Sequence, residues 1–186
     1  MRLVKLILLG LIIASCDNNP NSYKPISSGN IHTVTVVIGN ALWQSQVGDR
    51  VREVFATEFL GLPQQEPLFS LKQISPDIFS GFTRSSRNVL TVLKTKRDTS
   101  RIAKNKYAAP QVVVEIFGKN NKEIINQINL YATRAIKAFK QNEIEEKQRR
   151  IKKSILETDE LMNLHVDLTL PSAYKVFKKE KGSKLW

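Results

Sequence analysis

The chain has very little cysteine. Cys16 is the only one among 186 residues, so no disulfide can form within the chain. Histidine is also scarce, since His32 and His165 stand far apart and no helical spacing adds carboxylates to either. The motifs G-x-S-x-G, H-E-x-x-H and G-x-G-x-x-G are absent, as is the P-loop. The sequence therefore indicates no catalytic centre, metal site or cofactor, and it favours a binding or structural protein over an enzyme.

Acidic residues are few compared with basic ones. The chain has 29 Lys and Arg but only 17 Asp and Glu, which gives a formal net charge of +12. Such an excess attracts anionic lipid head groups, acidic glycans or nucleic acid. The densest basic run, residues 147–153, has no interleaved aromatic residues for base stacking, so we expect no nucleic-acid partner. An anionic partner in the cell envelope stays open.

Acidic residues one helical turn before that run change its interpretation. On a helix, an acid four residues before a base stabilises by a few tenths of a kcal/mol. We therefore expect residues 143–153 to form a solvated helical extension whose charges are largely self-paired. The expected pairs are Glu143–Lys147, Glu145–Arg149 and Glu146–Arg150.

Long apolar runs are limited to one, at the N-terminus. It covers about a dozen residues from Leu3 to Ala14, whereas a membrane-spanning helix needs about 20. A basic start, a short apolar core and small residues at its end are typical of a signal peptide. Because residues 13–16, Ile-Ala-Ser-Cys, resemble a bacterial lipobox, we predict that residues 1–15 are a lipoprotein signal peptide and that Cys16 is acylated. The alternative is a secretory signal with an incidental cysteine.

This prediction implies a location and a membrane partner. Thioether- and amide-linked acyl chains on Cys16 would supply the two or more lipid groups that stable anchoring needs. We therefore expect a protein of the cell envelope that is held in the outer membrane through Cys16. Residues 16–30 are rich in Asn, Ser, Pro and Gly, which predicts a flexible tether.

Residues 31–186 are predicted to form one α+β domain. We expect a mostly antiparallel sheet in β-α-β-β-β-α order, with two helices packed on one face and residues 94–106 as an exposed loop. In a half-buried strand every second side chain faces out, so Glu115 is expected to face solvent. The predicted strands are residues 32–38, 68–74, 88–93 and 110–117, and the apolar helix positions are Trp43, Val47, Val51, Val54, Phe55, Ile124, Ile128, Tyr131, Ala135 and Phe139.

Several short motifs together carry a family resemblance. They are the lipobox, Ser28-Gly29-Asn30, Trp43 with Val47-Gly48-Asp49, residues 61–69, Gly118-Lys119-Asn120-Asn121, Lys147-Gln148-Arg149-Arg150 and Pro171-Ser172-Ala173-Tyr174. With these the chain resembles a family of lipoproteins of the Bacteroidota that is known only as a domain of unknown function. Members of that family look about twice this long, with a second α+β half after the last motif. The resemblance implies that this chain is an N-terminal half and that its domain is incomplete.

Three functions therefore stay open. The first is a lipid-anchored envelope protein with a binding or structural role. The second is a hydrolase-like envelope enzyme whose site is completed by a missing C-terminal half. The third is a basic module that binds an anionic polymer or lipid head groups.

Overall fold

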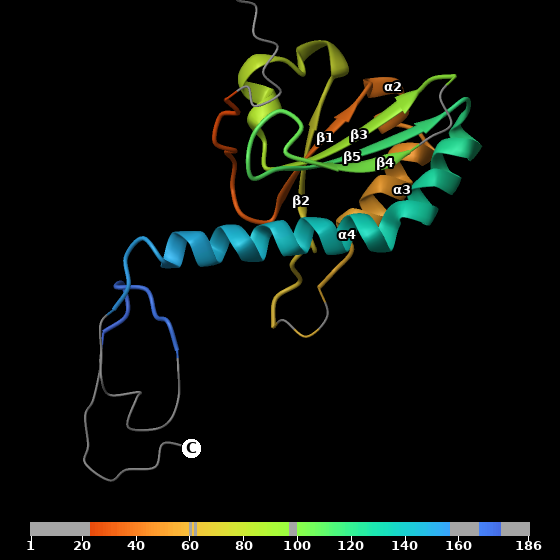
Figure 1. Ribbon diagram of the computed structural model, residues 1–186. Coiled ribbons are helices and arrows are strands. Elements are labelled where there is room, and N and C mark those ends of the chain that lie inside the picture. The colour runs from red at the N-terminus through yellow and green to blue at the C-terminus, as the bar shows by residue number, and fades with distance from the viewer. Residues whose placement is uncertain (1–22, 60, 62, 97–99, 157–167, 176–186) are drawn as a thin grey trace, which may run out of the picture.

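The computed structural model describes residues 23–59, 61, 63–96, 100–156 and 168–175. Within them a five-stranded sheet lies between a layer of α-helices and a layer that contains two short 3₁₀ helices (Figure 1). This confirms the predicted mixture of helices and sheet. The elements are β1 (Thr33–Ile38), α2 (Asn40–Trp43), α3 (Gln46–Phe55), β2 (Ser70–Ile74), η1 (Pro76–Ile78), η2 (Gly81–Ser85), β3 (Asn88–Lys94), β4 (Arg101–Lys104), β5 (Val112–Gly118) and α4 (Asn121–Ile151).

The sheet runs in the order β2-β1-β3-β5-β4, and its strand directions differ from the prediction. β1 is parallel to β2 and to β3, and β3 is parallel to β5, so the expected mostly antiparallel sheet is wrong. Parallel neighbours need connections of a dozen residues or more, and residues 39–69, 75–87 and 95–111 are long enough to supply them. The near-continuous apolar runs of β1, β3 and β5 are typical of parallel strands that are buried on both faces.

The one antiparallel strand, β4, lies where an exposed loop was expected. Arg101–Lys104 pairs with β5 at the edge of the sheet, with Ile102 opposite Val114 and packed against the core. A strand of four residues with a charge at each end shows almost no periodicity in the sequence. Such short, charged strands are common at sheet edges, because they resist pairing with other chains.

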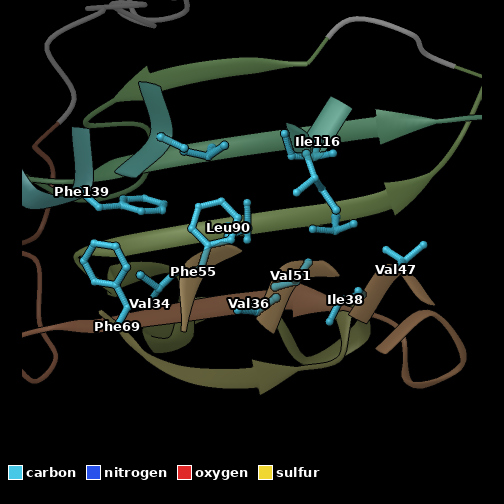
Figure 2. Packing of buried hydrophobic residues seen from close by; sticks show 14 of the residues in the cluster. Val34, Val36, Ile38, Val47, Val51, Phe55, Phe69, Leu90, Ile116 and Phe139 are labelled. Carbon is cyan, nitrogen blue, oxygen red and sulfur yellow. The ribbon is translucent and has the colours of Figure 1, made fainter. Parts of the chain in front are cut away.

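The main core lies between the sheet and the two longer helices, as predicted. Val47, Val51 and Phe55 of α3, and the expected stripe of α4, pack on the strand side chains of that face (Figure 2). Phe139 of α4 lies with its ring centroid 6.2 Å from that of Phe55 and 5.8 Å from that of Phe69. The predicted packing of two helices on one face is therefore confirmed.

The first helical segment is interrupted at Gln44 and Ser45, just before α3. The chain leaves α2 and begins α3 at Ser45, whose hydroxyl accepts a hydrogen bond from the amide of Val47. A Cβ at Gly48 would lie 1.8 Å from the carbonyl oxygen of Trp43, so only glycine permits this approach. Asn120 caps α4, since its side chain accepts from the amide of Glu123 at 2.9 Å.

Part of the predicted tether is attached to the domain. The amide of Ala109 donates to the carbonyl of Pro25 at 2.9 Å, and the amide of Ser28 donates to the carbonyl of Ser85 at 2.8 Å. A free tether would therefore end before Pro25. Cys16, the signal peptide and residues 17–22 lie outside the described residues, so their roles stay predictions.

The end of the predicted α+β domain lies partly outside the described residues. His165 is not described, and of the region beyond residue 157 only 168–175 are described, with one bridge between Ile155 and Pro171. Among the described helices, none is both long enough and apolar enough to cross a membrane.

Candidate functional site

A groove of about 430 Å³ lies between α4 and the strand edge of the sheet. One wall comes from the end of β4 and the turn that leads into β5, and the other comes from the middle of α4. The lining residues are Lys104, Asn105, Pro110, Gln111, Val112, Arg134, Lys137, Ala138, Gln141, Asn142 and Glu145.

The strand wall of the groove is fixed by Gln111, a buried residue. The Gln111 side chain donates to the carbonyls of Arg84 and Ser86 at 2.6 and 2.7 Å, and it accepts from the amide of Tyr107 at 2.8 Å. Its backbone exchanges hydrogen bonds with Asn105, which has a positive φ of 52°. These bonds hold the turn in one conformation, so the groove has a preformed wall.

Three exposed cations give the groove its charge. Lys104, Arg134 and Lys137 line it, and within the described part of the chain none of them forms an ion pair. The guanidinium of Arg134 lies 4.4 Å from the ring centroid of Tyr131, which leaves its charge uncompensated. Glu145 is the acid of the lining, so the groove carries a net positive charge.

A buried polar cluster lies behind the groove, and Asn142 connects the two. Its side-chain amide donates to the carbonyl of Arg87 at 3.2 Å and to Oδ1 of Asn88 at 2.9 Å. Glu143 Oε1 accepts from Asn88 at 2.7 Å and lies 3.4 Å from Nη1 of Arg87. We call Arg87, Asn88, Asn142, Glu143 and Glu146 the Arg87 cluster; each of them is at most 5% exposed.

Glu146 is the most strongly held acid of the Arg87 cluster. Its carboxylate accepts from Nε of Arg149 and from Nε of Arg150, both at 2.7 Å, and it lies 3.6 Å from Arg87. The hydrogen bond from Arg149 is the main cause that lowers the pKa of Glu146 to about 2, against an ordinary value of 4.5. Glu146 is therefore ionised throughout the physiological range and is not a proton donor.

The pairing within this helix differs from the expected i, i+4 pattern. Only Glu146–Arg150 forms as predicted. Glu143 turns inward to Arg87 and accepts from the backbone amide of His32 at 3.1 Å, while Lys147 contacts Nε2 of His32 at 2.9 Å. Arg149 pairs with Glu146, three residues earlier, instead of Glu145. The solvated extension is thus partly a buried polar interface.

Glu115 also differs from its prediction. It lies on the sheet face opposite the helices, yet it is only 7% exposed. Burial would raise its pKa, but hydrogen bonds from Lys106 and Arg101, at 2.6 and 2.5 Å, outweigh burial and lower it. Glu115 is thus a structural anion that joins β4 to β5.

In the part of the chain that the structure describes, no three His, Cys, Asp or Glu side chains lie close enough to hold a metal ion. The buried acids Glu115, Glu143 and Glu146 are each matched by cations. The sequence did not indicate the groove, because its cations come from segments 30 residues or more apart and follow no local motif.

Comparison with known proteins gives one match. A family model described as a domain of unknown function, DUF8532, matches residues 27–152. The chain belongs to this family. The match covers the whole sheet and α4, and so includes both the groove and the Arg87 cluster. Neither the curated proteins nor the solved structures contain a match.

Proposed function

We propose that the protein is a lipid-anchored binding protein of the cell envelope, held in the outer membrane through Cys16, whose groove takes an anionic partner. The lipobox-like residues 13–16 support the anchor. The groove supports the binding role, which may be tested without the anchor.

The proposed binding role rests on a difference in ion pairing between the buried acids and the cations of the groove. Glu143 and Glu146, although buried, are paired with nearby cations, whereas Lys104, Arg134 and Lys137 surround a preformed groove without an ion pair among the described residues. Like charges repel, so such a group destabilises the free protein slightly. An anionic ligand removes that repulsion and gains charge-assisted hydrogen bonds.

Removal of the three charges tests the groove. In the variant Lys104→Gln/Arg134→Gln/Lys137→Gln we expect the salt concentration that elutes the protein from heparin to fall markedly, because fewer counterions are released on binding. The matched control is Lys72→Gln/Lys119→Gln/Lys122→Gln, which removes the same charge from exposed positions outside the groove. Equal elution of the two variants would show that binding depends on net charge and not on the groove.

Replacement of the anchor residue tests the location. In Cys16→Ser we expect no labelling by a palmitate analogue, and the protein should move from the outer-membrane fraction to the soluble envelope fraction. Binding to heparin should be unchanged, because the groove is intact. Undiminished labelling of the variant would contradict the anchor.

A further inference from the structure

Four large apolar side chains project from the layer that contains η1 and η2. Tyr23 is 89% exposed, Ile26 68%, Ile78 59% and Phe82 83%. Single exposed apolar residues are ordinary, but a group of them marks an interaction surface.

Hydrogen bonds place these residues on one side of the molecule. The hydroxyls of Ser28 and Ser85 lie 2.9 Å apart, which joins the segment that contains Ile26 to η2. Ser85 also donates to the carbonyl of Phe82 at 2.7 Å, and the Thr83 hydroxyl donates to the carbonyl of Ile78 at 3.1 Å. In Figure 1 this layer and α4 lie on opposite faces of the sheet.

Cations accompany the apolar side chains. Lys24 lies between Tyr23 and Ile26, and its ammonium group donates to the carbonyl of Asn105. The guanidinium of Arg84 lies 5.2 Å from the ring centroid of Tyr107. Amphipathic aromatic residues beside cations are suited to the interface between water and anionic lipid.

The length of the N-terminal chain limits which side can face the bilayer. Cys16 lies nine positions before Pro25, where the chain is hydrogen-bonded to the domain. Fully extended, this segment spans about 30 Å, and as a flexible chain it typically spans about 17 Å. A globular unit of the matched length has a radius of gyration near 14 Å, and so a width of roughly 36 Å. An anchor at Cys16 therefore reaches the face that carries residues 23–26 more readily than the exposed outer face of α4.

We propose that Tyr23, Ile26, Ile78 and Phe82, with Lys24 and Arg84, form a membrane-facing surface that rests on anionic lipid head groups. This inference relies on the lipid anchor proposed above. The anchor keeps the domain near the bilayer, and the surface determines which side of the domain faces it. This orientation places the exposed outer face of α4 away from the bilayer.

The test compares two exposed apolar positions on opposite faces of the sheet. Acylation would block the thiol of Cys16, so Phe82→Cys and Leu130→Cys would each offer one free thiol on the full mature chain; Leu130 is 64% exposed on α4. Each variant is labelled with a polarity-sensitive dye and reconstituted in vesicles of phosphatidylethanolamine and phosphatidylglycerol that carry a nitroxide lipid. We expect quenching several-fold stronger at position 82 than at position 130.

Each other result has a definite meaning. Equal quenching, or stronger quenching at position 130, would overturn the orientation. A dye at position 82 that is shielded from both the nitroxide lipid and aqueous iodide would show that a second protein copy covers this face, which also overturns it.

Failure of the anchor would be recognised separately. Two dyes per chain would show that Cys16 is a free thiol, which contradicts the proposed anchor and not the surface. The unacylated chain would then be sedimented with the same vesicles. Loss of sedimentation in Phe82→Ser but not in Leu130→Ser would still support the surface, and the same sedimentation of both variants, including none, would overturn it.

Discussion

The two halves of α4 lie in the same helix but are stabilised differently. Its first half buries the apolar side chains Ile124, Ile128 and Ala135 against the sheet. Its second half buries Glu143 and Glu146 against Arg87. At 31 residues the helix is about 46 Å long, whereas the seven-residue strands span about 23 Å, so its end extends past the sheet (Figure 1). The comparison shows that one helix can bury apolar side chains along one part and charged side chains along the next. The apolar side chains pack on the sheet, and the charged ones lie against Arg87.

The largest expected effect is in the first half. Ile128→Asp should remove a fully buried side chain and place an unpaired carboxylate in the core, which we expect to cost about 5 kcal/mol or more of unfolding free energy. A domain has roughly 5–15 kcal/mol of unfolding free energy in total, so we expect this variant to be largely unfolded. The control is Leu130→Asp, two residues away and 64% exposed, which should cost less than about 0.5 kcal/mol. Urea unfolding followed by circular dichroism measures both, and similar midpoints would mean that the buried face of α4 is assigned wrongly.

A substitution in the charged contacts of the second half of α4 should lower the unfolding free energy almost as much, for an electrostatic reason. Arg87→Met leaves Glu143 buried without its counter-charge, which we expect to cost about 3–5 kcal/mol. In the double variant Arg87→Met/Glu143→Gln the charge is gone, but the amide oxygen can still accept from Asn88. We expect this variant to regain part of the lost stability, because the backbone amide of His32 loses its carboxylate acceptor. If the double variant is no more stable than the single one, shape and not charge governs this part of the interface.

Lowering the pH should destabilise the charged contacts in the second half of α4 and should leave the apolar contacts of the first half unchanged. The pKa of Glu146 is about 2 in the folded protein and 4.5 as an ordinary carboxyl, so its contribution is complete above about pH 4.5 and is lost as the pH falls toward 2. A shift of this size corresponds to at most about 3 kcal/mol, and less in practice because Arg149 and Arg150 are partly exposed to solvent. Urea midpoints of the wild type and Glu146→Gln, measured from pH 6 to pH 2.5 (roughly the window of that titration), should converge as the pH falls. A constant difference would show that Glu146 does not titrate in this window.

The same contrast explains what the sequence could predict. Ile124, Ile128 and Phe139 follow helical spacing, so the sequence alone predicts that they share one buried face of a helix. The partner of Glu143 lies 56 residues earlier, and nothing near Glu143 in the sequence identifies it. A local pattern therefore predicted a surface pair with Lys147, and the tertiary contact replaced it.

The sheet and the groove show the same distinction. The apolar runs predicted the positions of β1, β2, β3 and β5. The direction of each strand depends instead on the path of the connections, which an apolar run does not indicate. Glu115 was expected to face solvent because alternate residues of a strand point to opposite faces. Its face is covered, and Arg101 and Lys106 supply the charge that makes its burial tolerable.

The smallest expected effect distinguishes two possible partners of Arg149 within the same helix. The sequence pattern pairs Arg149 with Glu145, whereas the structure pairs it with Glu146 at 2.7 Å. Arg149→Ala should cost less than about 1 kcal/mol, because Arg150 and Arg87 still neutralise Glu146. A double-mutant cycle separates the two pairings, since coupling is measurable only between side chains that interact. We expect coupling of a few tenths of a kcal/mol or more between Arg149→Ala and Glu146→Gln, and none between Arg149→Ala and Glu145→Gln. Coupling between Arg149 and Glu145 alone would show that Arg149 forms the surface pair that the sequence predicted. Glu146 would then be held by Arg150 and Arg87.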